Sequence, residues 1–143
     1  MDNFVYTYRQ KQEAGFHKIA EIRIKWGLLL FGTGNVLITG MERILIIDDC
    51  KADQEMIQQH YCELCPNFDT AGCGEEAFYL INKYDYDLII ISNDLPDLNG
   101  TWIIQHLKKT VNSEIVLTSY FNHGVLERMA QRLDVSFKGK PIK

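Results

Sequence analysis

The chain has 143 residues, the length of one ordinary domain, so a second full-sized domain within these residues is not expected. Its 15 lysines and arginines against 19 aspartates and glutamates give a formal net charge of −4, which argues against a nucleic-acid-binding surface of the usual basic kind. Hydrophobic residues at 46% and charged residues at 24% are typical of a folded globular protein and not of a disordered one.

Residues 1–40 are predicted to be an N-terminal extension, separate from a domain at residues 41–143. Residues 10–26 have the spacing of an amphipathic helix, with Phe16, Ile19 and Trp26 on one side. Residues 26–41 carry no charge but contain several glycines, and they fall short of the roughly 18 apolar residues that a membrane span needs. We therefore predict no membrane segment and a cytoplasmic location.

The four cysteines are too few and too unevenly spaced to indicate a disulfide scaffold, which agrees with a reducing compartment. Cys62 and Cys65 form a CxxC pair, but a zinc site needs four ligands and no second pair follows at a suitable spacing. A redox or metal module built on this pair is therefore a weaker alternative, to be tested by metal content and thiol titration.

From residue 41 onward, short apolar runs alternate with segments of helical spacing, which is typical of βαβ units and a parallel sheet. Strands are predicted at residues 43–47, 68–70, 87–92, 114–118 and 135–137. Helices are predicted at residues 52–64, from about residue 75 onward, at 101–109 and at 125–133. An all-helical bundle is disfavoured, because the β-branched runs are short and end in polar residues such as Asp48 and Ser92. The fold class is therefore α/β, a doubly wound five-stranded parallel sheet.

Polar side chains follow the strands at the positions where a doubly wound sheet binds its ligands, outside the carboxyl ends. Asp48 and Asp49 follow the first strand, Ser92 and Thr118 end the third and fourth, and Lys140 follows the fifth. Adjacent carboxylates suit Mg²⁺, which keeps several waters and needs few protein ligands. The lysine can pair with an anion, and the threonine can donate a hydrogen bond to a phosphoryl oxygen.

Five segments in this order and spacing make residues 41–143 resemble the receiver domain of bacterial response regulators. They read ILIIDD (44–49), AGCGEEA (71–77), YDLIIISNDLPDLNG (86–100), TS (118–119) and KP (140–141). The resemblance implies a flavodoxin-like fold and a place in two-component signal transduction. The family also has a fifth helix after the KP pair, for which only two residues remain here.

In the family, an aspartate at the end of the third strand accepts a phosphoryl group from a partner's phosphohistidine, with Mg²⁺ bound. The resemblance implies that Asp48, Asp49 and the backbone carbonyl of Asp94 would hold the metal and that Lys140 would pair with the phosphoryl group. It also implies that Thr118 and Phe137 are the hydroxyl and aromatic pair that reports phosphorylation to the face formed by the fourth helix, fifth strand and fifth helix.

The chain departs from the family at the phosphoacceptor, because Ser92 stands four residues before Pro96 and eight before Gly100, where the family has its aspartate. A serine hydroxyl needs a general base to attack phosphorus, and it cannot form an acyl phosphate. The prediction is a regulatory pseudo-receiver, not an enzyme, which acts by protein–protein interaction without taking up phosphate. Mg²⁺ binding should be weakened, because one carboxylate is lost.

Two alternatives keep phosphoryl chemistry: the carboxylate of Asp94 as acceptor, or Ser92 itself with Asp48 or Asp49 as its base. The expected partner is a signalling protein, namely a histidine kinase, a phosphotransfer protein or an effector protein. No nucleic acid and no membrane are expected. The missing fifth helix would leave apolar surface, which the helix at residues 10–26 could fill, or through which the chain could form a homodimer.

Overall fold

The computed structural model describes residues 28–30, 36–38, 42–63, 65 and 67–142. The chain divides into two units, Met1–Met41 and Glu42–Lys143. In the first unit, strands β1 (Leu28–Leu30) and β2 (Val36–Ile38) pair antiparallel, with Leu29 opposite Leu37. This strand pair was not predicted, although two apolar runs on either side of glycine and asparagine residues are typical of a hairpin. The helix predicted at residues 10–26 lies outside the described residues.

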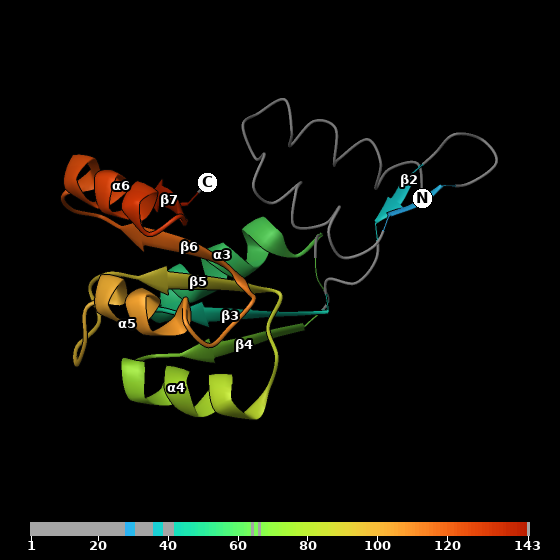
Figure 1. The fold of residues 1–143 in the computed structure, drawn as a ribbon, viewed down its shortest axis with the longest axis horizontal. Coiled ribbons are helices and arrows are strands. Elements are labelled where there is room, and N and C mark those ends of the chain that lie inside the picture. Colours follow the sequence, from blue (N-terminus) through green and yellow to red (C-terminus); the bar gives the residue numbers. More distant parts are fainter. Residues whose placement is uncertain (1–27, 31–35, 39–41, 64, 66, 143) are drawn as a thin grey trace. The chain divides into compact units, whose positions relative to one another are not determined.

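The second unit is built on a five-stranded parallel sheet (Figure 1). Its strands are β3 (Arg43–Ile47), β4 (Asn67–Ala71), β5 (Leu88–Ser92), β6 (Glu114–Ser119) and β7 (Ser136–Gly139). They lie in the order β4-β3-β5-β6-β7, and every neighbouring pair is parallel. All five predicted strands are confirmed, and the largest difference is that β7 extends to Gly139, beyond the predicted end at residue 137.

Four helices connect these strands: α3 (Lys51–Tyr61), α4 (Gly74–Lys83), α5 (Gly100–Leu107) and α6 (His123–Arg132). Each corresponds to a predicted helix, although α3 ends at Tyr61 and not at residue 64. In the part of this unit that the structure describes, no helix follows β7. The doubly wound receiver-type sheet without a fifth helix is therefore confirmed.

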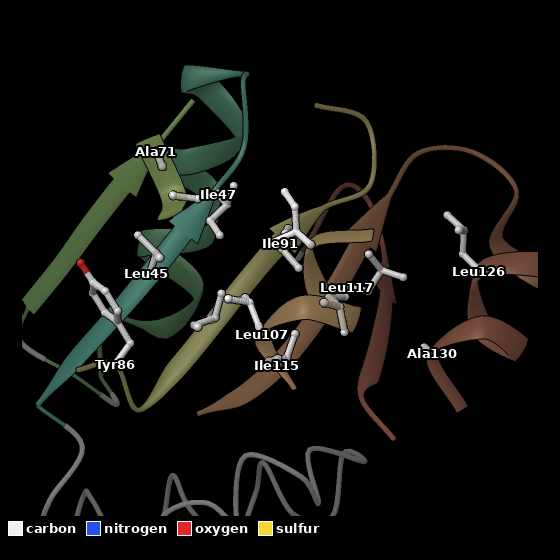
Figure 2. Close-up of a cluster of buried hydrophobic side chains, with 14 residues drawn as sticks. Leu45, Ile47, Ala71, Tyr86, Ile91, Leu107, Ile115, Leu117, Leu126 and Ala130 are labelled. Atoms are coloured by element: carbon white, nitrogen blue, oxygen red, sulfur yellow. The ribbon is translucent and has the colours of Figure 1, made fainter. Parts of the chain in front are cut away.

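The main hydrophobic core lies between the sheet and the helices α4, α5 and α6 (Figure 2). Alternate strand residues such as Leu45, Ile91 and Leu117 point into this core and are fully buried. The intervening residues, Ile46 and Ile90 among them, are also 0% exposed. Burial on both faces explains why these strands are continuous apolar runs and do not alternate with polar residues.

The register of the sheet brings the ends of several strands to one edge. Ile47 at the end of β3 pairs with Ile91, and Ser92 at the end of β5 pairs with Thr118 of β6. The backbone N–H of Lys140, just after β7, donates a hydrogen bond to the carbonyl oxygen of Ser119 at 2.8 Å. The ends of β5 and β6 and the residue that follows β7 therefore lie close together at the carboxyl edge of the sheet.

Candidate functional site

The side-chain ammonium of Lys140 is the centre of the site. Its Nζ donates hydrogen bonds to Asp48 Oδ2 at 2.7 Å, to Ser92 Oγ at 3.1 Å and to Asp53 Oδ2 at 3.4 Å. The side chains of Lys140, Asp48 and Asp53 are 4%, 1% and 8% exposed. The cluster therefore holds two carboxylates and one ammonium away from solvent, where their attraction is screened much less than at the surface.

Asp48 is held in place from both sides. Its Oδ1 accepts a hydrogen bond from the backbone N–H of Cys50 at 2.9 Å, and its backbone oxygen accepts one from Gln54 Nε2 at 2.6 Å. Burial raises the pKa of the Asp48 carboxyl, and the hydrogen bonds from Lys140 and Cys50 oppose this rise. Both oxygens of the carboxylate are therefore already engaged as acceptors.

Ser92 occupies the predicted phosphoacceptor position at the end of β5 and is 1% exposed. Its Oγ accepts hydrogen bonds from Lys140 Nζ and, at 3.3 Å, from the backbone N–H of Asp94. The structure thus brings Asp48, Ser92 and Lys140 together, with a hydroxyl where the family has a carboxylate.

Thr118 and Phe137, the residues predicted to report phosphorylation, lie on the neighbouring strands β6 and β7. Thr118 is fully buried, and its Oγ1 donates a hydrogen bond to the carbonyl oxygen of Ile91 at 3.3 Å. The half-buried ring of Phe137 packs edge-on against His123 of α6, with ring centroids 5.5 Å apart. Their signalling role stays a prediction.

The two other residues expected at the metal site are exposed. Asp49 lies at the start of the β3–α3 connection, and the carboxylate of Asp94 accepts a hydrogen bond from Ser119 Oγ at 2.7 Å. Among the residues that the structure describes, no three aspartate, glutamate, histidine or cysteine side chains converge as metal ligands. The ammonium of Lys140, 2.7 Å from Asp48 Oδ2 and 3.4 Å from Asp53 Oδ2, already bonds to the carboxylate oxygens that a cation would need, so this arrangement of side chains does not fit Mg²⁺.

Two residues of the site were missed from the sequence: Asp53 and Tyr120. Asp53 lies in the first turn of α3, and the hydroxyl of Tyr120 donates a hydrogen bond to its Oδ1 at 2.6 Å. This hydrogen bond raises the pKa of Tyr120 to about 12. The tyrosine ring also faces the ammonium of Lys140, with Nζ 5.0 Å from the ring centroid. Two features of the sequence could have indicated these residues. Asp53 is a carboxylate in the first turn of the helix that follows Asp48, and Tyr120 is an aromatic residue directly after the fourth strand of the parallel sheet.

The CxxC pair does not form a joint site. The Sγ of Cys62 donates a hydrogen bond to the carbonyl oxygen of Gln59, whereas that of Cys65 donates to Asn67. Neither cysteine forms a disulfide in the described part of the chain; Cys62 is exposed and Cys65 is buried. The structure therefore offers no support for a redox or metal module at this pair. Separately, none of the described helices has the length and apolar character that crossing a membrane requires.

Comparison with known proteins matches residues 44–139 to the response regulator receiver domain. The cell cycle transcriptional regulator CtrA of Caulobacter vibrioides is 33% identical over 78 residues, which are 54% of this chain and 34% of CtrA. The transcriptional regulatory protein HprR of Escherichia coli is 32% identical over 74 residues, or 52% of this chain and 33% of HprR. The chain thus matches about a third of the length of these relatives.

Solved structures agree with this family. A two-component response regulator from Clostridium difficile is 26% identical with a TM-score of 0.65, over 71% of this chain and 85% of that one. TrrA from Thermotoga maritima, solved in complex with Mg²⁺ and BeF, is 27% identical with a TM-score of 0.62, over 72% of this chain and 90% of that one. The sheet order, the residues gathered at its carboxyl edge and the family match over residues 44–139 together show that this chain belongs to the response regulator receiver domain family.

Proposed function

We propose that this receiver domain is a phosphorylation-independent pseudo-receiver, a regulatory module that acts by binding a signalling protein. The observation that carries the proposal is the hydroxyl of Ser92 at the end of β5, 3.1 Å from Lys140 Nζ, where a phosphoacceptor carboxylate would be needed. An ionised carboxylate attacks phosphorus without a base, whereas a serine hydroxyl must first lose its proton to one.

The surroundings of Ser92 do not supply that base readily. Ser92 shares Lys140 as a partner with Asp48, and the two carboxylate oxygens of Asp48 already accept hydrogen bonds from Lys140 and Cys50. Lys140 donates hydrogen bonds to the serine oxygen and to both buried carboxylates, and an ammonium group is a donor only, with no lone pair to accept the proton. We therefore expect that Ser92 does not become a phosphoserine at this site.

Asp94 is the alternative acceptor, because it carries an exposed carboxylate two residues beyond Ser92. Its Oδ2 is bound by the hydroxyl of Ser119. Asp94 lies in the β5–α5 loop. The carboxylates to which the ammonium of Lys140 donates are those of Asp48 and Asp53. This arrangement favours the pseudo-receiver over phosphorylation at Asp94.

The contact surface that we propose for a protein partner consists of exposed apolar side chains beside the site. Tyr120, Phe121 and Val125, at the junction of β6 and α6, are 45%, 64% and 50% exposed. We define these three residues as the β6–α6 patch. Adjacent exposed apolar side chains of this kind are typical of interaction surfaces. The partner that we propose is a histidine kinase, a phosphotransfer protein or an effector, and a second copy of the chain would appear as a dimer in analytical ultracentrifugation.

The proposal is tested by incubating the full chain with acetyl phosphate and Mg²⁺ and measuring its intact mass. The wild type should gain no phosphoryl group, whereas Ser92→Asp should gain one, because the variant restores the carboxylate beside Lys140. Ser92→Asn is the matched control, since it has the size of the aspartate variant without its charge.

A phosphoryl group on the wild type would overturn the proposal. In that case Asp94→Asn separates the two alternatives: loss of the added mass would assign the phosphoryl group to Asp94, and its persistence, with loss in Ser92→Asn, would assign it to Ser92.

A further inference from the structure

We infer that Asp53, Lys140 and Tyr120 form a metal-independent clamp that holds the carboxyl edge of the sheet in one conformation. This inference rests on the proposed function, because it concerns a site that carries neither a phosphoryl group nor a phosphoacceptor carboxylate. The clamp consists of the hydrogen bond from Tyr120 to Asp53, the ion pair of Asp53 with Lys140 and the contact of the Tyr120 ring with the Lys140 ammonium.

The clamp joins three segments that are far apart in the chain. Tyr120 in the β6–α6 junction is 67 residues from Asp53 in the first turn of α3, and Lys140 after β7 is 87 residues from it. Each of the two oxygens of Asp53 takes one partner, Oδ1 the tyrosine hydroxyl and Oδ2 the ammonium. Asp53 is therefore the shared anchor to which both later segments are tied.

Charge explains why a second carboxylate is needed at this position. The side chain of Lys140 is 4% exposed, and a buried ammonium is retained only when it is paired and hydrogen-bonded. Ser92 offers it a neutral oxygen, so Asp48 and Asp53 supply the negative charge. In return, the ammonium neutralises part of the charge of the two carboxylates, which is the task that a divalent cation would otherwise perform.

The clamp also determines how the β6–α6 patch is presented. Tyr120 belongs to the patch and is anchored through its hydroxyl, while the backbone N–H of Phe121 donates a hydrogen bond to Ser119 Oγ at 3.0 Å. These bonds involve neither a phosphoryl group nor a metal ion. The clamp thereby ties the Tyr120 side chain and the backbone of Phe121, from which the exposed side chain of Phe121 projects.

Hydrogen exchange of the full chain, without any phosphodonor, tests the clamp directly. Tyr120→Phe removes one hydroxyl and Asp53→Asn removes one charge. Because a hydrogen bond to a charged group contributes appreciably to local stability, each variant should speed exchange of the Phe121 and Lys140 amides by about tenfold. Tyr79→Phe is the matched control, since Tyr79 is 64% exposed on α4, away from the site.

A second measurement tests metal independence by thermal unfolding with EDTA or with Mg²⁺. The melting temperature of the wild type should be the same in both, whereas Ser92→Asp should melt higher with Mg²⁺, because it adds a carboxylate to the edge.

Unchanged exchange in Tyr120→Phe, or a wild type stabilised by Mg²⁺ as much as Ser92→Asp, would overturn the clamp. If Asp53→Asn fails to fold, Tyr120→Phe alone decides. Uptake of a phosphoryl group by the wild type would refute the proposed function. Hydrogen exchange and thermal unfolding are measured without a phosphodonor, so failure of the clamp can be told apart from failure of the proposed function.

Discussion

Lys140 shows how a single charged side chain can be buried in a small domain. Its ammonium has three hydrogen-bond acceptors in the structure, two of them carboxylate oxygens. An ammonium has three protons to donate, so each acceptor takes one. The residue is therefore fully satisfied, and the carboxylates around it depend on its charge.

Replacing Lys140 by methionine should destabilise the protein strongly, because Asp48 would remain buried without a counter-charge. Removing one partner of a buried ion pair costs about 3 kcal/mol or more, and this loss should appear in the midpoint of urea unfolding. The double variant Asp48→Asn with Lys140→Met should recover part of the stability, since it leaves no charge from the pair. If Lys140→Met alone were as stable as the wild type, the ion pair of Lys140 with Asp48 would not be buried in solution.

At the scale of the elements, the β5–α5 loop packs against neighbouring segments at close range. Asp97 in this loop accepts hydrogen bonds from the backbone N–H groups of Gly74 and Glu75 at 2.8 and 3.1 Å. The bond from Gly74 contributes most to lowering the pKa of Asp97. Cys73 stands at the N-cap of α4 without a side-chain cap, so Asp97, 23 residues beyond Gly74, performs that function.

Gly100, the first residue of α5, is predicted to tolerate no side chain. A Cβ at this position would lie 2.5 Å from the backbone oxygen of Ser92 and 2.9 Å from the Cα of Asn93. Both are backbone atoms that cannot move aside easily, so Gly100→Ala should cost about 2 kcal/mol in urea unfolding.

Gly124→Ala is the control for this substitution. The glycine lies in α6, and the nearest atom to an added Cβ is a side-chain nitrogen of Arg128 at 3.8 Å. Alanine favours a helix more than glycine does, so this variant should be as stable as the wild type or slightly more stable. Equal effects of the two substitutions would contradict the close approach at Gly100.

At the scale of the whole molecule, both faces of the central strands are covered. Ile89 and Ile91 of β5 belong to the core beneath α4, α5 and α6, while Ile90 between them is equally buried on the opposite face (Figure 2 shows Ile91 in this core). Two layers of packing therefore support the same strand that carries Ser92 at its end. The site is positioned by the most deeply buried part of the sheet.

Ile89→Ala and Ile90→Ala should consequently destabilise the protein by similar amounts, about 3 kcal/mol each in urea unfolding. Val125→Ala, at a residue that is 50% exposed, should change the stability by less than about 1 kcal/mol. A small effect of Ile90→Ala beside a large effect of Ile89→Ala would show that only one face of the sheet is covered in solution.

The elements and the strand-end residues could be read from the sequence because their signals are local. A run such as residues 44–47 is apolar and β-branched throughout, and the polar residue that ends it marks the edge of the sheet. Helix ends were predicted less accurately, because the last turn of α3 depends on tertiary packing. The strand pair β1–β2 was missed because each of its strands is only three residues long.

Residue type and spacing alone were enough to predict the five-stranded parallel sheet, the family resemblance and the position of Ser92 where the family has its phosphoacceptor carboxylate. Those features depend on residue type and on spacing along the chain. The three-dimensional packing was needed to show that Asp53 shares Lys140 with Asp48 and that the hydroxyl of Tyr120 bonds to Asp53. These contacts join α3 to segments 67 and 87 residues away, and local patterns of hydrophobicity do not encode distances between such segments.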